Sequence, residues 1–76
     1  MSGLRSIHYK DFEKFLLFVG CEFKRQKGSH RIYTRFDLRR PLVVPANNNL
    51  SIMVIRSNLQ TLKIPVEKYL EIISKI

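Results

Sequence analysis

The stretch Lys27-Gly28-Ser29-His30-Arg31 brings together an imidazole, a hydroxyl and two cations. An unperturbed imidazole titrates near pH ~6.5, so one histidine can take up a proton and release it again near neutral pH. Neighbouring cations can hold a phosphate group while negative charge builds up on it. These residue types in this spacing are therefore suited to acid–base chemistry on a phosphodiester, or to binding one.

An amphipathic helix is predicted before this stretch. Phe12, Phe15, Leu16 and Val19 follow the i, i+3, i+4, i+7 pattern, and Leu17 and Phe18 widen this apolar stripe. The charged residues of the segment, Lys10, Asp11, Glu13 and Lys14, are expected on the solvent side. The pattern predicts a helix from about Tyr9 to Val19. Gly20 follows at the position where glycine commonly ends a helix.

A three-stranded antiparallel sheet is predicted next. Residues 21–27 and 30–36 alternate between apolar and polar over part of their length, and Gly28-Ser29 lies between them as a two-residue turn. A second turn at residues 37–40 leads to a short third strand at residues 42–44. Proline precedes and follows that strand, which restricts its pairing and favours an edge position.

Helical patterns return after the sheet. Apolar spacing predicts a helix from about Ser51 to Leu62, and Pro65 can stand in the first turn of a final short helix. The element order is thus α-β-β-β-α-α. We expect an α+β fold in one domain, residues 1–76, with the helices packed on one face of the three-stranded sheet.

Side chains alternate across a strand, so the second strand has two faces. We expect Ile32 and Phe36 to contact the helices, and parity places His30 and Thr34 on the same face. The other face then carries Arg31, Tyr33 and Arg35, beside Lys24 and Gln26 of the neighbouring strand. His30 has two interpretations: a packed residue at the rim of the core, or a hydrated residue at the corner of the hairpin.

The charge is strongly positive and unevenly placed. The net charge is +8, and seven of the 14 Lys and Arg residues lie between residues 24 and 40, where Asp37 is the only acid. The partner favoured by this charge is a polyanion, and RNA, DNA and anionic lipid all qualify. The outer face of the sheet is either an ordinary solvated face or a phosphate-binding surface; the near absence of acids favours phosphate.

Several classes of protein are disfavoured. Cys21 is the only cysteine, which precludes an internal disulfide, and the histidines and cysteine lack zinc-site spacing. We therefore expect a cytoplasmic protein without a metal or a small-molecule cofactor. Neither a signal peptide nor a membrane span is predicted, because no apolar run reaches the required length.

The remaining chemistry-bearing residues have structural interpretations. His8 is predicted to be a surface or capping residue of the first helix, and Cys21 a small core residue. Residues two apart on a helix point in different directions, so Asp11 and Glu13 are predicted to lie on a solvated face rather than to form a catalytic pair. Met53 is expected in the core with Ile55 and Leu59.

Four sequence elements together resemble the HicA toxin family, also called YcfA-like. These elements are Gly20, the run from Arg25 to His30, the strand end Val43-Val44-Pro45, and Arg56-Ser57. The resemblance covers nearly the whole chain. It implies a fold like that of double-stranded-RNA-binding domains, a toxin of a type II toxin-antitoxin system that cleaves mRNA, and a HicB antitoxin as protein partner. It also implies that His30 is the catalytic residue.

Two departures from the family pattern stand out. Many members carry a second histidine just after the proline that ends the third strand, where this chain has Pro45-Ala46-Asn47. Any role of that group is absent here or belongs to Asn47. Many members also begin the following helix with Gly-Thr, where this chain has Met53-Val54.

The expected activity is metal-independent RNA cleavage, with His30 as base, acid or both in sequence. Lys27 and Arg31 are the nearest phosphate-binding candidates, Ser29 can donate its hydroxyl, and Tyr33 can stack on a base or donate a proton. The full set of predicted RNA-binding residues is Lys24, Lys27, Gly28, Ser29, Arg31, Tyr33 and Arg35.

Two other functions are alternatives to RNA cleavage. A non-catalytic RNA-binding module would use the same basic surface to recognise A-form shape. A DNA-binding or antitoxin-like regulator is disfavoured, because no helix carries a run of base-reading polar and basic residues.

Overall fold

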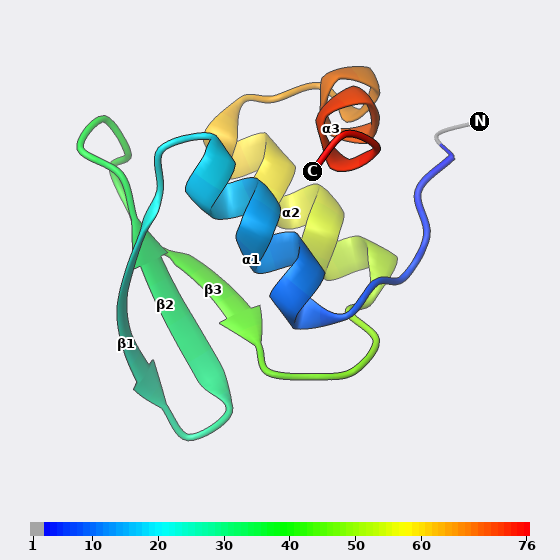
Figure 1. Ribbon diagram of the computed structural model, residues 1–76. Helices are drawn as coiled ribbons and strands as arrows, with labels where there is room; N and C mark the ends of the chain where they lie inside the picture. Colours follow the sequence, from blue (N-terminus) through cyan, green and yellow to red (C-terminus); the bar gives the residue numbers. More distant parts are fainter. Residues whose placement is uncertain (1–2) are drawn as a thin grey trace.

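The structure, a computed structural model, describes residues 3–76. The chain forms an α+β fold in the predicted order α-β-β-β-α-α, and the helices lie to one side of the sheet (Figure 1). The elements are α1 (Tyr9–Phe18), β1 (Glu22–Lys27), β2 (His30–Thr34), β3 (Leu42–Pro45), α2 (Ile52–Leu62) and α3 (Val66–Ile73). Within the described residues, no helix combines the length and the apolar character needed to span a bilayer.

Helix α1 begins and ends where the sequence predicts. The Nδ1 atom of His8 accepts a hydrogen bond from the Lys10 N–H (3.1 Å), which confirms the capping role of this histidine. At the other end Gly20 has φ +93°, and the Gly20 and Cys21 N–H groups donate to carbonyls of the last turn. The chain leaves the helix at Gly20 with a positive φ, a backbone conformation that glycine adopts without steric cost.

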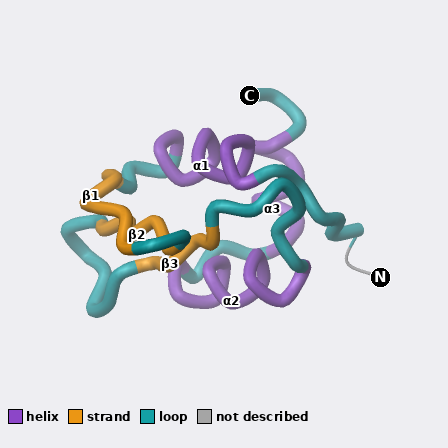
Figure 2. Tube along the Cα trace, turned by 90° about the horizontal axis from the view of Figure 1, so that it is seen from below, coloured by secondary structure: helices purple, strands orange, loops and turns teal. Residues whose placement is uncertain are grey.

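The three strands form one antiparallel sheet in the order β1-β2-β3. Figure 2 shows the sheet beside α1 and α2, with β3 nearest to α2. Gly28 has φ +61°, as a two-residue hairpin turn with a left-handed first position requires. The register of β1 against β2 shifts between Phe23 and Arg25, so Lys24 is the extra residue of a bulge.

The prediction of which face of β2 contacts the helices is wrong. Tyr33 is completely buried, together with Leu42 and Val44 of β3, whereas His30 is exposed. Phe36 lies beyond the strand and is completely exposed. The alternating pattern did not decide between the faces, because a tyrosine on one face competed with an isoleucine on the other. The tyrosine is buried because α1 supplies a partner for its hydroxyl.

The core between sheet and helices is one continuous hydrophobic cluster. Tyr69 of α3 packs on the rings of Phe12 and Phe15, with centroid distances of 5.9 and 4.8 Å. Cys21 is buried in the same cluster, as predicted.

Helix α2 begins within one residue of the predicted start at Ser51 and buries most of the predicted stripe. Ser51 Oγ accepts a hydrogen bond from the Val54 N–H, and Ile55 and Leu59 are buried. The prediction for Met53 is wrong, since this side chain is 81 % exposed. It lies two residues before Ile55 and therefore points to a different side of the helix.

Candidate functional site

His30 is the first residue of β2 and lies at an open corner of the sheet. Its registered neighbours are Lys27 in β1 and Pro45 in β3, so the three side chains share the outer face, away from the helices. The Ser29 carbonyl accepts a hydrogen bond from the Ala46 N–H (2.7 Å), which fixes the hairpin turn to the end of β3. Because His30 is exposed, its interpretation as a packed residue is wrong.

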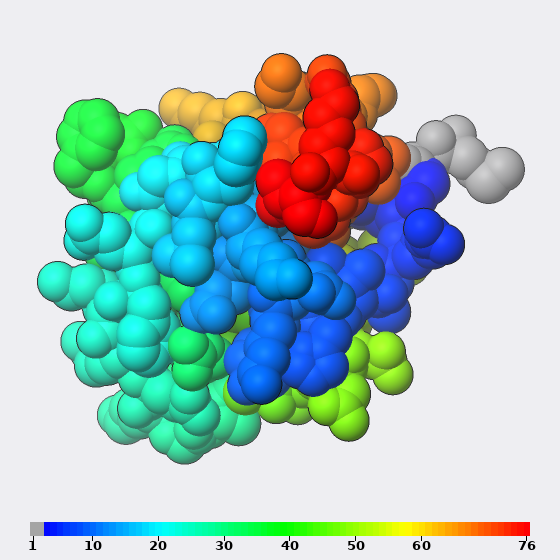
Figure 3. All heavy atoms as spheres, in the orientation of Figure 1, coloured from blue at the N-terminus to red at the C-terminus, as the bar shows by residue number. Residues whose placement is uncertain are grey.

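The outer face beside His30 is cationic. After the bulge at Lys24, Arg25 pairs with Ile32 and Lys27 pairs with His30, so both cations share the face of the imidazole. Within residues 3–76 none of Lys24, Arg25 and Lys27 forms an ion pair with an acid. Figure 3 shows the hairpin side chains projecting at the lower left, beyond the helices. These charges are therefore available to an anionic ligand.

Arg31 and Tyr33 lie on the opposite face and contact Glu13 of α1. One carboxylate oxygen of Glu13 accepts from the Tyr33 hydroxyl (2.6 Å) and from Arg31 Nη2 (2.8 Å). Arg31 Nε also donates to the Tyr33 hydroxyl oxygen (3.1 Å). The prediction that Glu13 lies on a solvated face is wrong, because the residue is half-buried in this cluster. We call these three residues the Glu13 cluster.

The proton affinities of the Glu13 cluster follow from these contacts. Burial raises the pKa of Glu13, but the hydrogen bonds from Tyr33 and Arg31 outweigh it and leave the pKa below the usual value. Burial and the bond to the Glu13 carboxylate raise the pKa of Tyr33 to about 12. The bonds to Tyr33 and Glu13 raise the pKa of Arg31. At neutral pH the cluster therefore holds an anion, a cation and a neutral phenol.

Gln26 extends the Glu13 cluster to the hairpin turn. Its side-chain oxygen accepts from Arg31 Nη1 (2.7 Å), and its amide nitrogen donates to the Gly28 carbonyl (2.9 Å). The Arg31 guanidinium also lies 4.2 Å from the centroid of the Phe23 ring. A continuous set of hydrogen bonds thus runs from helix α1 to the turn that precedes His30.

Arg35 is also held by the protein. Its guanidinium donates to both oxygens of Asp37 (2.6 and 3.1 Å) and to the Val19 carbonyl at the end of α1 (2.9 Å). The hydrogen bonds from Arg35 lower the pKa of Asp37. The predicted outer face of Arg31, Tyr33 and Arg35 is therefore wrong: two of these residues join the Glu13 cluster and the third fixes a loop.

The predicted site residues thus divide into two groups. Lys24, Lys27, Gly28, Ser29 and His30 are exposed in and beside the hairpin corner. Arg31 and Tyr33 support the corner from inside, and Arg35 fixes the loop at the other end of β2. Arg25 also lies on the outer face, which the sequence did not predict. The bulge that reorients it leaves no mark in the alternating pattern that a single sequence offers.

Two further features complete the corner. The Asn47 carbonyl accepts from the Tyr9 N–H (3.2 Å), so the loop after β3 is joined to the beginning of α1, and the Asn47 residue is exposed. Within residues 3–76 no group of three or more His, Cys, Asp or Glu side chains is placed to hold a metal ion. The corner thus presents an exposed imidazole, with Lys27 opposite it and the Ser29 hydroxyl next to it in sequence.

Comparison with known proteins identifies the family. A family model described as the HicA toxin of bacterial toxin-antitoxin systems matches residues 9–64, which include α1, the whole sheet, α2 and the hairpin corner. No curated protein and no solved structure matches the chain. Since the matched region covers well over half of the chain, the protein belongs to the HicA toxin family and is the toxin of a toxin-antitoxin system.

Proposed function

We propose that this toxin is an endoribonuclease that cleaves mRNA without a metal ion, and that His30 transfers the protons. The observation that supports the proposal best is the place of His30: an exposed imidazole at a corner of the sheet, in register with Lys27 and on the same face as Arg25. A ribose-phosphate chain can reach this corner without any movement of the core. The positive charge around it attracts such a chain from solution.

The reaction needs two proton transfers. Neutral His30 removes the proton from a ribose 2′-hydroxyl, and the 2′-oxygen attacks the adjacent phosphorus. The bond from phosphorus to the 5′-oxygen breaks, and that oxygen takes a proton from the imidazolium or from water. The products are a 2′,3′-cyclic phosphate and a 5′-hydroxyl. General acid–base catalysis by one group contributes ~10²–10⁴-fold, which predicts a modest nuclease.

Lys27 is the best placed group for stabilising the phosphate. Directly opposite residues of an antiparallel pair have Cβ atoms about 4.5–5.5 Å apart, so the Lys27 ammonium can reach a phosphate that contacts His30. The Ser29 hydroxyl and the Gly28 backbone lie in the turn itself, and Lys24 and Arg25 extend the cationic surface along β1. The Glu13 cluster has a different role here, which is to hold the corner in place.

The antitoxin partner is proposed to be of the HicB type. Its inhibitory segment is expected to be acidic and to cover His30, because one contact would then block the imidazole and neutralise the cations beside it. The RNA and the antitoxin would therefore compete for the outer face of β1 and β2.

The test is cleavage of a purified RNA in EDTA, followed by analysis of the product ends by mass spectrometry. We expect cleavage in EDTA, 2′,3′-cyclic phosphate ends, and no cleavage at a position where the 2′-hydroxyl is replaced by hydrogen. A requirement for a divalent cation, or 5′-phosphate ends, would contradict the proposed chemistry. Tight RNA binding without any cleavage would instead identify a non-catalytic RNA-binding module.

A further inference from the structure

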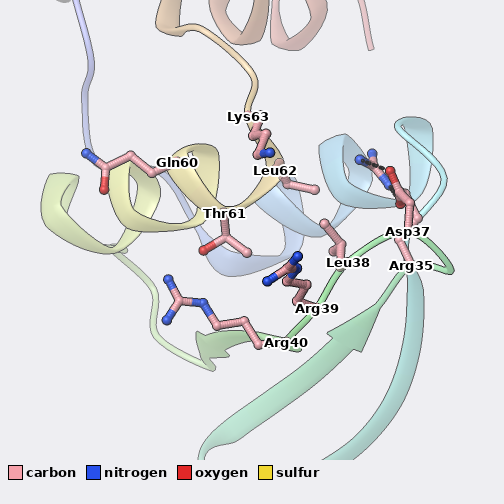
Figure 4. Close-up of a pocket in the computed structure, with 9 residues that line it drawn as sticks. All are labelled: Arg35, Asp37, Leu38, Arg39, Arg40, Gln60, Thr61, Leu62 and Lys63. Carbon is pink, nitrogen blue, oxygen red and sulfur yellow. Dashed lines mark hydrogen bonds and ion pairs between the residues drawn. The ribbon is translucent and has the colours of Figure 1, made fainter.

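A concave surface lies at the other end of β2 and β3, away from His30. It is a cavity of about 530 Å³ between the β2–β3 loop and the C-terminal end of α2 (Figure 4). The loop contributes Arg35, Asp37, Leu38, Arg39 and Arg40, and the helix end contributes Gln60, Thr61, Leu62 and Lys63. We call it the loop cavity.

The charge of the loop cavity is positive. Arg35 and Asp37 neutralise each other to one side, as the dashed lines in Figure 4 show. Arg39, Arg40 and Lys63 are exposed, and within the described part of the chain none of them forms an ion pair. Three like charges around one opening repel one another, so a bound anion would stabilise this arrangement.

A completely exposed aromatic ring stands in the same loop. Phe36 is 100 % exposed, although a phenylalanine is ordinarily among the most buried residues. The ring does not line the loop cavity but borders a neighbouring hollow, whose other lining residues are Gly20, Glu22, Lys24, Thr34 and Arg35. Arg35 lines both the hollow and the loop cavity, so the ring lies next to the cavity. Cations that hold a backbone and a free ring that can stack on a base are the two components of surfaces that bind single-stranded nucleic acid.

We infer that the β2–β3 loop and the end of α2 form a second RNA-binding site, in which Arg39, Arg40 and Lys63 bind the phosphate backbone and Phe36 stacks on a base. The inference rests on the proposed function, because it extends the same RNA from His30. Five residues of extended strand, from His30 to the loop, span roughly 16 Å. At ~3.4 Å per stacked nucleotide the second site binds the strand about five nucleotides from the cleaved bond.

RNA fits the loop cavity better than a protein segment does. The centre of a protein interface is apolar and poor in charge, whereas the apolar members of this lining, Leu38 and Leu62, are half-buried and buried beneath the polar ones. Guanidinium and ammonium groups around an open cavity match the geometry of phosphate contacts.

The experiment measures RNA binding in a protein that carries His30→Ala, so that the RNA stays intact. A labelled single-stranded RNA longer than about 10 nucleotides, twice the inferred span, is titrated by fluorescence anisotropy at several salt concentrations. The test variant adds Arg39→Ala and Arg40→Ala. The control adds Lys68→Ala and Lys75→Ala, which remove the same charge from the exposed surface of α3 and its C-terminal end.

We expect the arginine variant to bind the long RNA at least about tenfold more weakly than the parent. The slope of log K against log salt concentration should also be smaller in magnitude by about 1.4, because two phosphate contacts to a single strand are lost. The control should bind like the parent. The difference should disappear with an RNA of about three nucleotides, which cannot span the two sites. Phe36→Ala and Phe36→Leu should both weaken binding of the long RNA about tenfold, because neither side chain stacks.

Equal affinity of the arginine variant and its control for the long RNA would overturn the inference. So would equal loss in both, since that would reflect net charge and not the cavity. If the arginine variant binds RNA like its control but no longer binds its antitoxin, the cavity is a protein-binding site. Failure of the proposed function is seen separately, as wild-type protein that does not cleave RNA.

Discussion

Replacement of Glu13 by alanine should destabilise the protein more than any other change to an acidic side chain among the described residues. The carboxylate is the common acceptor for the Tyr33 hydroxyl and for Arg31, and both donors would lose it at once. Tyr33 is completely buried, so no water replaces the acceptor there. Arg31 would be left half-buried without a counter-charge.

The magnitude follows from the two bonds. Leaving a buried donor without an acceptor costs about 1–3 kcal/mol, and losing a bond between charged groups costs about as much. The Arg31 side chain is 19 % exposed and keeps its bond to Gln26, which reduces its share. We therefore expect Glu13→Ala to lower the free energy of unfolding by about 2–4 kcal/mol. For a chain of this size this corresponds to a melting temperature lower by about 10–25 °C.

Urea unfolding followed by circular dichroism measures this change directly. Asp11→Ala is the matched control, since this carboxylate lies on the same helix and only reaches Lys14 at 3.9 Å on the exposed surface. Its removal should change stability by less than about 0.5 kcal/mol. Equal stability of Glu13→Ala and the control would show that the Glu13 cluster contributes nothing to folding.

Three further outcomes follow from the same structure. Because the pKa of Glu13 is lowered in the folded protein, its carboxylate stabilises the fold at pH values above the ordinary glutamate pKa of ~4.3, and this stability is lost as the pH falls below it. Acid should therefore destabilise wild type more than Glu13→Gln, as measured by urea titrations at several pH values. Tyr33 and Tyr69 have pKa values raised from 10.0 to about 12, so stability should fall as the pH rises through this range, with ultraviolet absorbance of the phenolates appearing together with unfolding. Gly28→Ala should lower the free energy of unfolding by about 1–2 kcal/mol, because residue 28 has a φ of +61°. The added methyl group itself meets no neighbouring atom within 4 Å. Gly28→Asn should lower the free energy of unfolding by less in the same assay.

The helices were predictable because their signals are local. The apolar spacing from Phe12 onwards, Gly20 as the left-handed stop and Ser51 as the N-cap each act within one or two turns of the chain. The hairpin was predictable for the same reason, since Gly28-Ser29 separates the strands by a two-residue turn.

The orientation of β2 was not predictable, because it depends on a distant residue. Arg31 and Tyr33 turn inward to meet Glu13, which lies 18 and 20 positions earlier in the sequence. The order arginine, isoleucine, tyrosine at residues 31–33 does not indicate which face of β2 contacts Glu13. Arg25 was missed because the bulge at Lys24 shifts its direction relative to Phe23.

His30 is exposed as predicted, although the two faces of β2 are exchanged relative to the prediction. The prediction of a hydrated imidazole came from its position next to the glycine turn, and parity argued for the opposite. The structure reverses the parity and so exposes His30 for a second reason: it faces away from the helices. Lys27 stays beside it, because the register of a two-residue hairpin places the flanking residues opposite each other.

The catalytic role proposed for His30 is tested by the cleavage rate of one labelled RNA, in EDTA and with protein in excess, for wild type and for His30→Ala. Because the His30 side chain is exposed, the free energy of unfolding of the variant should differ from that of wild type by less than about 0.5 kcal/mol. It should also bind the RNA with nearly the same affinity. The cleavage rate of His30→Ala should be lower than that of wild type by ~10²–10⁴-fold. Cleavage by a folded His30→Ala protein at the wild-type rate would show that the imidazole does not carry the reaction.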